Sequence, residues 1–361
     1  MHKKISAAIQ FIPQFLAPMI SGLSSFLLDT YNQKTFTSTD PSRASLQHQQ
    51  NYISYLKNYL SSVTYTQYME KNRKYDLMVI TGGLSKGESV DNIKKTQFFY
   101  NSSDISNFEV FGEDSAFTVL SSRYSFFGIA DGVGGYRKYR IDPSLFSSTL
   151  MKLCLNKSLT VIKNYARPNC KKIIDDGYNQ LLSLQERIYG GSTINISCFD
   201  HRSGELSISN LGDSRVMVIQ PTRNQIFTTN SQQHHFNCPY QLSNTSDDIV
   251  ITNFTFKQFD SEQYSLQLHH GDIIIIGTDG FFDNMSPEDI IEITKKYNYG
   301  RESFPIYYHT LLDTARKYAF DPLKISPFGL EHLEQKKQPF LGGKRDDITL
   351  IVAVVLERKN Q

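Results

Sequence analysis

The chain has 361 residues, enough to bury the core of one large domain or of two ordinary ones. Its 38 lysines and arginines nearly balance its 36 aspartates and glutamates, which argues against a nucleic-acid-binding surface and against a groove for acidic substrates. The cysteines are far apart in the sequence, which favours free thiols in a reducing compartment over a disulfide framework or a zinc site. They are Cys154, Cys170, Cys198 and Cys238.

The first 28 residues contain no acidic residue, carry Lys3 and Lys4, and are interrupted by Pro13 and Pro18. Their apolar runs are much shorter than the roughly 20 residues of a membrane-spanning helix, so we expect no stable membrane span. An acid-free, weakly basic, amphipathic start is typical of an organelle import sequence, although such sequences are usually richer in arginine. A secretory signal is the alternative.

Residues 30–69 are rich in Ser, Thr, Gln, Asn and Tyr and show little periodic apolar content, which indicates a linker. We therefore divide the chain into two parts. Residues 1–69 form an N-terminal targeting and linker region that is partly disordered, and residues 70–361 form a single domain without an internal repeat.

Short runs rich in β-branched and aromatic residues, bounded by Gly, Asp or Asn, predict the strands of this domain. The first run covers residues 75–81 and ends at Gly82-Gly83. In chain order, the other predicted strands are residues 116–120, 125–130, 192–199, 205–211, 215–220, 264–268, 272–277 and 348–356.

Helical patterning begins at residues 143–165, where Asp142 is placed to cap a helix that has Pro143 at its first position. The other predicted helices are residues 170–188, 287–296 and 302–318. Many strands with helices in pairs predict an α+β fold in which packed sheets are flanked by helices.

Acidic residues lie at the ends of four predicted strands. Asp131 and Asp279 each follow an apolar strand, and the doublets Glu113-Asp114 and Asp346-Asp347 each precede one. A carboxylate on a rigid strand end can face a cleft, and Mg²⁺ and Mn²⁺ are usually held by a few carboxylates and several waters. If Asp131 bridges two ions about 3.5–4 Å apart, a shared hydroxide could attack a phosphate ester. Taken singly, each Asp-Gly pair is more often a turn, and each doublet a solvated charge pair.

Taken together and in this order, these acidic residues match the motifs of a known protein family. Between about residue 75 and residue 356 the chain resembles the metal-dependent protein phosphatases of the protein phosphatase 2C family, with six of that family's motifs in order. They are Gly112-Glu113-Asp114, Ala130-Asp131-Gly132-Val133-Gly134-Gly135, Gly191-Ser192-Thr193, Asn210-Leu211-Gly212-Asp213-Ser214-Arg215, Thr278-Asp279-Gly280 with Asp283-Asn284, and Gly342-Gly343-Lys344-Arg345-Asp346-Asp347-Ile348-Thr349.

More narrowly, four stretches look like the family's mitochondrial branch: residues 131–135, Asp142-Pro143-Ser144, residues 236–242 and Ser326-Pro327-Phe328. The resemblance implies a central β-sandwich of two antiparallel sheets flanked by helices, a four-layer αββα fold. It also implies a mitochondrial matrix location, which supports the import interpretation of residues 1–28.

The resemblance implies a site for two Mn²⁺ or Mg²⁺ ions. Asp131 would bridge both ions, Glu113 and the carbonyl of Gly132 would ligate one, and Asp279 and Asp346 would ligate the other.

Two further aspartates complete the implied site. Asp114 would orient a metal-bound water, so that the implied catalytic set is Asp131, Asp279 and Asp114. Asp213 would help Asp279 to hold a third, loosely bound ion. The alternative for Gly212-Asp213 is a hairpin turn between the strands at residues 205–211 and 215–220.

The chain departs from the family pattern at two positions. Val133 replaces a histidine that many members use as general acid, and Glu109 replaces an arginine that grips the substrate phosphate. The mitochondrial branch shares the change at residue 133, so activity is still expected. The proton donor and the phosphate-binding residue are left unassigned.

Several residues could fill these two roles. His234 and His235 could supply an acid, and Arg137, Arg140 and Arg345 could make bidentate contacts with phosphate. For each of them, a solvated surface position is the commoner situation.

The predicted function is that of a serine/threonine phosphoprotein phosphatase that uses a metal-bridging hydroxide and forms no phosphoenzyme. One alternative is a pseudophosphatase that binds phosphoproteins, although such proteins usually lose metal carboxylates that this chain retains. Another is a phosphohydrolase that acts on a metabolite. Phosphoproteins are the expected partners, and the sequence indicates no oligomeric state.

Overall fold

The computed structural model describes residues 72–87, 97–100, 105–245, 261–297 and 300–358. The predicted targeting and linker region, residues 1–69, lies outside the described residues, so the import interpretation stays a prediction. Within the described part of the chain, no helix combines the length and the apolar character that crossing a bilayer requires.

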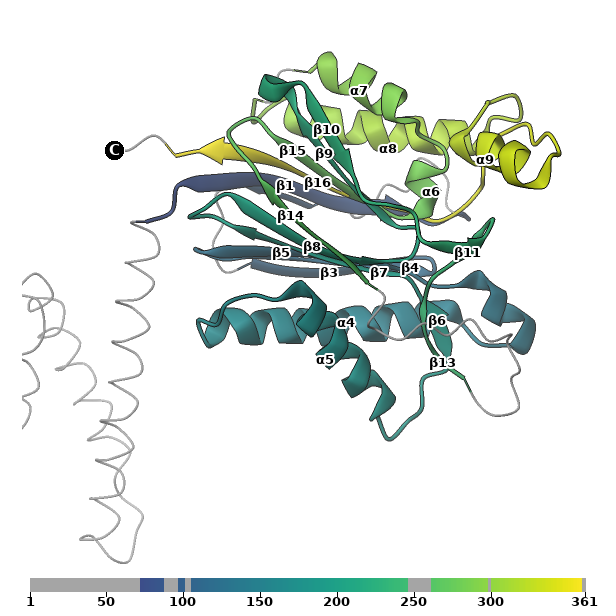
Figure 1. Cartoon of the computed structure of the whole chain (residues 1–361), viewed down its shortest axis with the longest axis horizontal. Coiled ribbons are helices and arrows are strands. Elements are labelled where there is room, and N and C mark those ends of the chain that lie inside the picture. The colour runs from purple at the N-terminus through teal and green to yellow at the C-terminus, as the bar shows by residue number, and fades with distance from the viewer. Residues whose placement is uncertain (1–71, 88–96, 101–104, 246–260, 298–299, 359–361) are drawn as a thin grey trace, which may run out of the picture. The chain divides into compact units, whose positions relative to one another are not determined.

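Two six-stranded antiparallel sheets lie face to face (Figure 1). In the first sheet, β1 pairs with β16 along its whole length, with Tyr75 opposite Glu357 and Leu84 opposite Ile348. In spatial order the strands of this sheet are β10 (Gln225–Thr228), β9 (Arg215–Gln220), β15 (Ile273–Gly277), β16 (Ile348–Glu357), β1 (Tyr75–Leu84) and β2 (Gln97–Tyr100).

The second sheet is built from strands of the middle of the chain. In spatial order these are β14 (Glu262–Gln267), β8 (Glu205–Leu211), β7 (Ile194–Asp200), β5 (Tyr124–Asp131), β4 (Asp114–Leu120) and β3 (Ile105–Phe111). Two short antiparallel pairs lie outside both sheets. They are β6 (Gly190–Ser192) with β13 (Leu242–Asn244), and β11 (Gln233–His235) with β12 (Cys238–Pro239).

Helices cover the outer face of each sheet (Figure 1). The helices α4 (Pro143–Lys163) and α5 (Cys170–Leu182) pack on the second sheet, and α7 (Pro287–Lys295) and α8 (Phe304–Phe320) lie over the first. The predicted four-layer αββα fold is thereby confirmed. The other helices in the described part of the chain are η3 (Gly134–Tyr139), η4 (Pro221–Arg223), α6 (Asp279–Phe282) and α9 (Pro327–Lys336).

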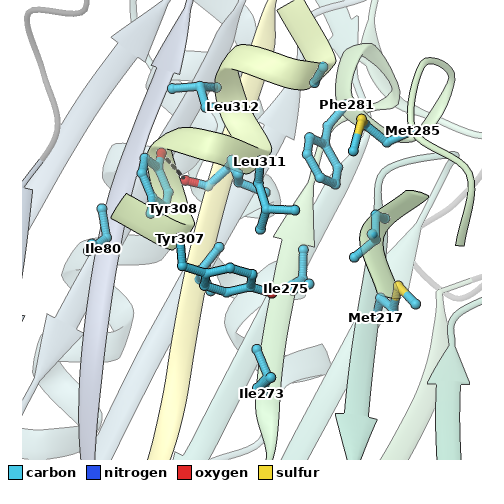
Figure 2. Close-up of a cluster of buried hydrophobic side chains, with 14 of the residues drawn as sticks. Ile80, Met217, Ile273, Ile275, Phe281, Met285, Tyr307, Tyr308, Leu311 and Leu312 are labelled. Atoms are coloured by element: carbon cyan, nitrogen blue, oxygen red, sulfur yellow. Dashed lines mark hydrogen bonds between the residues drawn. The ribbon is translucent and has the colours of Figure 1, made fainter. Parts of the chain in front are cut away.

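The buried apolar residues form three clusters that match the three interfaces between the layers. Figure 2 shows the cluster in which Tyr307, Tyr308, Leu311 and Leu312 of α8 pack on strands of the first sheet. The Tyr308 hydroxyl donates to the carbonyl of Leu350 on β16 at 3.0 Å, so this buried phenol has a partner. The central strands β5, β15 and β16 are buried on both faces over most of their length, which makes them a rigid frame for side chains at the end of the sandwich.

Most predicted elements lie within a few residues of the observed ones, and the strands β8 and β9 have the predicted bounds. Asp142 caps α4 as predicted, because its carboxylate accepts the N–H of Ser144 at 2.9 Å. The predicted strand at 192–199 is divided between β6 and β7, and the predicted helix at 170–188 ends at Leu182.

The strand β3 and the helix α9 were not predicted. β3 is an edge strand whose residues are mostly half-buried, so it lacks the alternation that marks a strand with one buried face. α9 did have a start signal, since Ser326 caps it and Pro327 occupies its first turn. Both elements matter for the site, because β3 leads into the turn that carries Glu113 and α9 borders the open hollow beside Asp283.

Candidate metal centre

Glu113 lies in a two-residue turn between β3 and β4, at the end of the sandwich. Gly112 precedes it with a φ of +69°, and a Cβ at Gly112 would lie 2.3 Å from Oδ1 of Asp347. Only glycine fits both demands. The N–H of Glu113 donates to Oδ2 of the buried Asp347 at 2.8 Å. Asp347, for which the sequence suggested no role, therefore holds the turn that carries a predicted metal ligand.

Asp114 and Asp131 lie directly opposite each other on β4 and β5. Asp114 is buried, and its Oδ2 accepts the hydroxyls of Thr278 and Thr349, each at 2.8 Å. These bonds join the second sheet to the first at the site. Burial raises the pKa of Asp114 well above its ordinary value, and the charge of Asp347 adds to the shift, whereas the two hydroxyls oppose it.

The motif at residues 191–193 fixes the end of β5. The N–H of Asp131 donates to the Thr193 hydroxyl at 3.1 Å, and its carbonyl accepts the Ser192 hydroxyl at 2.8 Å and the Thr193 N–H at 3.0 Å. Burial raises the pKa of Asp131 well above its usual range, followed by the charges of Asp114 and Asp279. These carboxylates are therefore close enough for the negative charges of Asp114 and Asp279 to disfavour ionisation of Asp131.

Asp279 starts α6 directly after β15, and Lys344 approaches it from the loop before β16. The Lys344 ammonium donates to Asp279 and, at 2.8 Å, to Asp283, and it lies 3.5 Å from Asp346. The side chain of Asn284 fixes the Lys344 backbone, accepting its N–H and donating to its carbonyl, both at 2.9 Å. Lys344 is thus a built-in counter-charge that the sequence analysis missed, although it lies in the last of the six motifs.

Asp213 lies where the chain crosses from one sheet to the other. Its alternative interpretation as a hairpin turn is wrong, because β8 belongs to the second sheet and β9 to the first. Gly212 makes the crossing possible with a φ of +104°. Asp213 is buried, and burial raises its pKa well above the ordinary value, with a further rise from the charge of Asp279. The crossing thus turns Asp213 toward the other carboxylates.

Gly132 occupies a cramped position beside Glu113. Its N–H donates to the carbonyl of Glu113 at 3.1 Å, and a Cβ there would lie 2.7 Å from the carbonyl oxygens of both Glu113 and Pro143. Any side chain at residue 132 would push the Glu113 turn away. The role of the Gly132 carbonyl as a ligand stays a prediction.

Two basic side chains contact the Glu113 carboxylate. The Lys86 ammonium lies 2.8 Å from Oε2, and the guanidinium of Arg137, on η3, donates to both oxygens. Burial favours the neutral acid, but the hydrogen bonds from Arg137 and Lys86 outweigh it and hold the pKa of Glu113 below its ordinary value. Neither contact was predicted for Glu113, because Lys86 is 27 residues away and Arg137 is 24 residues away.

As the side chains lie, no group of three or more acidic, histidine or cysteine side chains within the described ranges is arranged to hold a metal ion. Lysine and arginine contact the acids instead. A cation nevertheless fits the donor set, because Oδ1 of Asp213 and Oδ1 of Asp279 are buried without a hydrogen-bond partner. Such oxygens are costly to bury, and hard divalent cations prefer carboxylate oxygens.

The two departures from the family pattern lie on different elements. Val133 follows Gly132 at the end of β5, and Glu109 lies opposite Ala116 on the edge strand β3. Of the residues proposed to replace them, His234 packs against Tyr240 with ring centroids 4.7 Å apart.

The three arginines considered for phosphate contact have separate surroundings. The guanidinium of Arg345 lies over the ring of Phe320, 4.7 Å from its centroid. Arg137 and Arg140 line a hollow of about 300 Å³ together with Glu113. Within the described residues, Arg137 is the one arginine of these three that donates a hydrogen bond to a predicted metal ligand, Glu113.

Comparison with known proteins agrees with the fold and the motifs. The family profile described as Protein phosphatase 2C matches residues 96–240. The PTC7 protein phosphatase homologue of Homo sapiens is 35% identical over 250 residues, which cover 68% of this chain and 80% of that protein. The homologue of Xenopus laevis is 32% identical over 289 residues, covering 79% of this chain and 91% of the relative.

Among solved structures, the photosystem II phosphatase PBCP superposes with a TM-score of 0.57 at 24% identity, covering 77% of this chain and 98% of that one. At this identity the likeness concerns the fold alone. The sequence identity and the coverage of the PTC7 homologues are high enough to assign the family. The chain belongs to the protein phosphatase 2C family of metal-dependent serine/threonine protein phosphatases, in its PTC7 branch.

Proposed function

We propose that this phosphatase hydrolyses phosphoserine and phosphothreonine esters of proteins at the carboxylate cluster, with two Mn²⁺ or Mg²⁺ ions. Glu113, the Gly132 carbonyl and Asp131 would hold one ion, and Asp131, Asp279 and Asp346 the other. The observation that supports this most strongly is that the charges of Asp114 and Asp279 add to burial in raising the pKa of Asp131, a crowding of negative charge that a cation would relieve.

When bound, the divalent ions lower the pKa of water, so that a nucleophile forms at neutral pH, and they offset the charge of the phosphate. The chain orients the reacting groups. Both threonine hydroxyls donate to Oδ2 of Asp114, so Oδ1 is the oxygen that can accept a proton from a water beside the phosphate. Asp114 would thus position that water without joining the metal ligands.

Asp213 extends the proposed cluster. Its buried Oδ1 has no partner among the described residues, and its Oδ2 accepts only a long hydrogen bond, 3.3 Å, from Gln233. We propose that Asp213 and Asp279 hold a third, loosely bound divalent ion.

Protein substrates need space beside the reacting phosphate. An open hollow of about 930 Å³ borders Asp283 and runs between the N-terminus of α7 and the helix α9. None of the proposed metal ligands lines this hollow, but Asp283 shares the Lys344 ammonium with Asp279, and we propose that a polypeptide segment flanking the phosphorylated residue occupies it.

We also propose that the enzyme acts in the mitochondrial matrix on phosphoproteins there. The acid-free, weakly basic composition of residues 1–28 supports this location. Mass spectrometry of the N-terminus of the protein isolated from cells tests it. A mature protein that begins between residues 30 and 69 agrees with import, whereas an intact Met1 contradicts it.

The catalytic proposal is tested with the purified full chain and a phosphothreonine peptide. Turnover is expected to require added Mn²⁺ or Mg²⁺, and Asp279→Asn is expected to lower kcat by about a hundredfold or more, in the range of other lost catalytic electrostatic groups. Asp176→Asn is the matched control, since Asp176 pairs with Lys172 on the surface of α5. Full activity in excess chelator would overturn the proposal, and metal binding without turnover would indicate a phosphoprotein-binding pseudophosphatase.

A further inference from the structure

A phosphate dianion needs basic donors in addition to metal ions, and this chain has Glu109 where many relatives have an arginine. The replacement must come from another part of the chain. Within the described residues, three basic side chains make recorded ion pairs with the predicted metal ligands: Lys86, Arg137 and Lys344.

Lys344 is a poor candidate for binding the substrate. Its side chain is only 13% exposed, its ammonium is shared by Asp279 and Asp283, and its backbone is held on both sides by Asn284. A lysine enclosed in this way balances the charge of the acids. If it turned toward a ligand it would leave the buried Asp283, which is not a proposed metal ligand, unpaired.

Lys86 lies at the open edge of the cluster, and its backbone is anchored there. Its N–H donates to Oδ1 of Asp347 at 2.7 Å, and the same carboxylate holds the turn of Glu113. The ammonium lies 2.8 Å from Glu113 and 3.5 Å from Asp346, so it reaches acids predicted to ligate different ions. Its side chain is 34% exposed, so solvent and a ligand can reach it.

Arg137 approaches Glu113 from a different element, the helix η3. Its guanidinium pairs with both carboxylate oxygens and is 52% exposed. This planar fork fits two oxygens of a phosphate as well as it fits a carboxylate. The hollow of about 300 Å³ beside Arg137 is lined by Glu113 and Arg140 as well, which gives an anion access to the guanidinium.

We propose that Lys86 and Arg137 together bind the substrate phosphate and so replace the arginine absent at residue 109. The inference rests on the proposed function. Oε2 of Glu113 accepts hydrogen bonds from both cations, so an ion that ligates through this oxygen would displace at least one of them. A displaced cation would need another anion, and the phosphate of the substrate would supply one. Both side chains would make this contact from backbones that already flank Glu113.

The test uses the full chain carrying Lys86→Met or Arg137→Met, with inorganic phosphate as a competitive inhibitor of phosphopeptide hydrolysis. One lost charge-assisted hydrogen bond of about 1.5–3 kcal/mol corresponds to a rise of roughly 10- to 100-fold in the inhibition constant of phosphate and in KM. Lys86→Arg and Arg137→Lys are expected to recover part of this loss. Lys172→Met, on the exposed face of α5, is the matched control and should leave both constants unchanged.

Mn²⁺ binding in the absence of substrate separates phosphate binding from a structural role. Removal of a cation beside the metal site should leave the calorimetric Kd for Mn²⁺ unchanged or lower it. Weaker Mn²⁺ binding in either variant would assign Lys86 or Arg137 to support of the metal site and overturn the inference, as would an unchanged inhibition constant for phosphate. Failure of the proposed function itself would be distinct, because the unaltered protein would then show no Mn²⁺-dependent turnover.

Discussion

Asp114 and Asp131 face each other directly across the neighbouring strands β4 and β5, so two carboxylates occupy one cross-strand pair. Like charges in this position destabilise a sheet. Both residues are predicted catalytic groups, and a neutral residue at either position would remove one of them. The predicted function therefore requires the repulsion between the two carboxylates. Divalent ions are the partners that would relieve it.

The first prediction concerns this pair. Asp131→Asn should stabilise the protein in the absence of divalent ions by on the order of 1 kcal/mol, because it removes one of two opposed charges. For a domain of this size, that is a rise in Tm of about 2–4 °C. The same substitution should abolish the further rise that Mn²⁺ causes in the unaltered protein. Scanning calorimetry with chelator and with Mn²⁺ measures both effects, and a Tm that falls in chelator would show that Asp131 stabilises the fold more than its charge repulsion destabilises it.

Lys344 provides the second prediction. Lys344→Met leaves Asp279 and Asp283 without their shared counter-charge, so the free energy of unfolding in chelator should fall by about 3 kcal/mol. Mn²⁺ should recover most of this loss, since a divalent ion can take over the charge balance, and the Kd for Mn²⁺ should decrease. Urea unfolding with and without Mn²⁺ measures the difference, with the exposed Lys172→Met as the control. An equal loss of stability under both conditions would mean that Lys344 acts through packing.

The third prediction uses two glycines with similar backbones. Gly112 and Gly271 both have positive φ values, +69° and +83°, but only at Gly112 would a Cβ meet Asp347, at 2.3 Å. Around Gly271 nothing lies within 4 Å of the added atom. Both Ala variants should lose about 1 kcal/mol or more through backbone strain.

Only Gly112→Ala should also displace Asp347 and thereby release the Glu113 turn. Its Kd for Mn²⁺ should rise about tenfold or more, as is typical when a residue that supports a ligand is lost. Calorimetric titration of both variants gives the comparison. Equal Mn²⁺ affinities would contradict the role assigned to Asp347.

The fourth prediction concerns pH. His201 is buried away from the acids, between the Ser125 hydroxyl at 2.7 Å and the Tyr75 carbonyl at 2.8 Å. Burial, followed by the charge of Arg73, lowers the pKa of His201 from 6.5 to about 3. The folded protein therefore keeps His201 neutral where the unfolded chain binds a proton, so stability falls as the pH decreases from about 6.5 toward 3.

The expected slope is about 1.4 kcal/mol per pH unit from this one group, or about 2 kcal/mol between pH 6.5 and pH 5. His201→Gln should be less stable at pH 7 but should lose about 2 kcal/mol less than the unaltered protein on acidification to pH 5. Urea unfolding at both pH values measures this. An identical pH dependence in the two proteins would show that His201 is already protonated in the fold or titrates normally.

The sequence by itself determined most of the secondary structure and the identity of the acids. The runs at residues 205–211 and 215–220 have the bounds of β8 and β9, and Asp142 caps α4 as expected. Helix caps and strand alternation depend on residues that are close together in the sequence. They can therefore be recognised without knowing which elements pack against each other. The order of the acidic motifs then identified the family.

Only the tertiary structure decided how these acids are supported and which cations meet them. Asp347 reaches Glu113 across 234 residues and Lys86 across 261, and no local pattern encodes a contact of that span. The same holds for Asp213, whose neighbouring strands look like a hairpin in sequence but belong to different sheets. Sheet order and side-chain pairing depend on the packing of the whole domain, because a strand's period shows which face it buries and does not show which strand lies beside it.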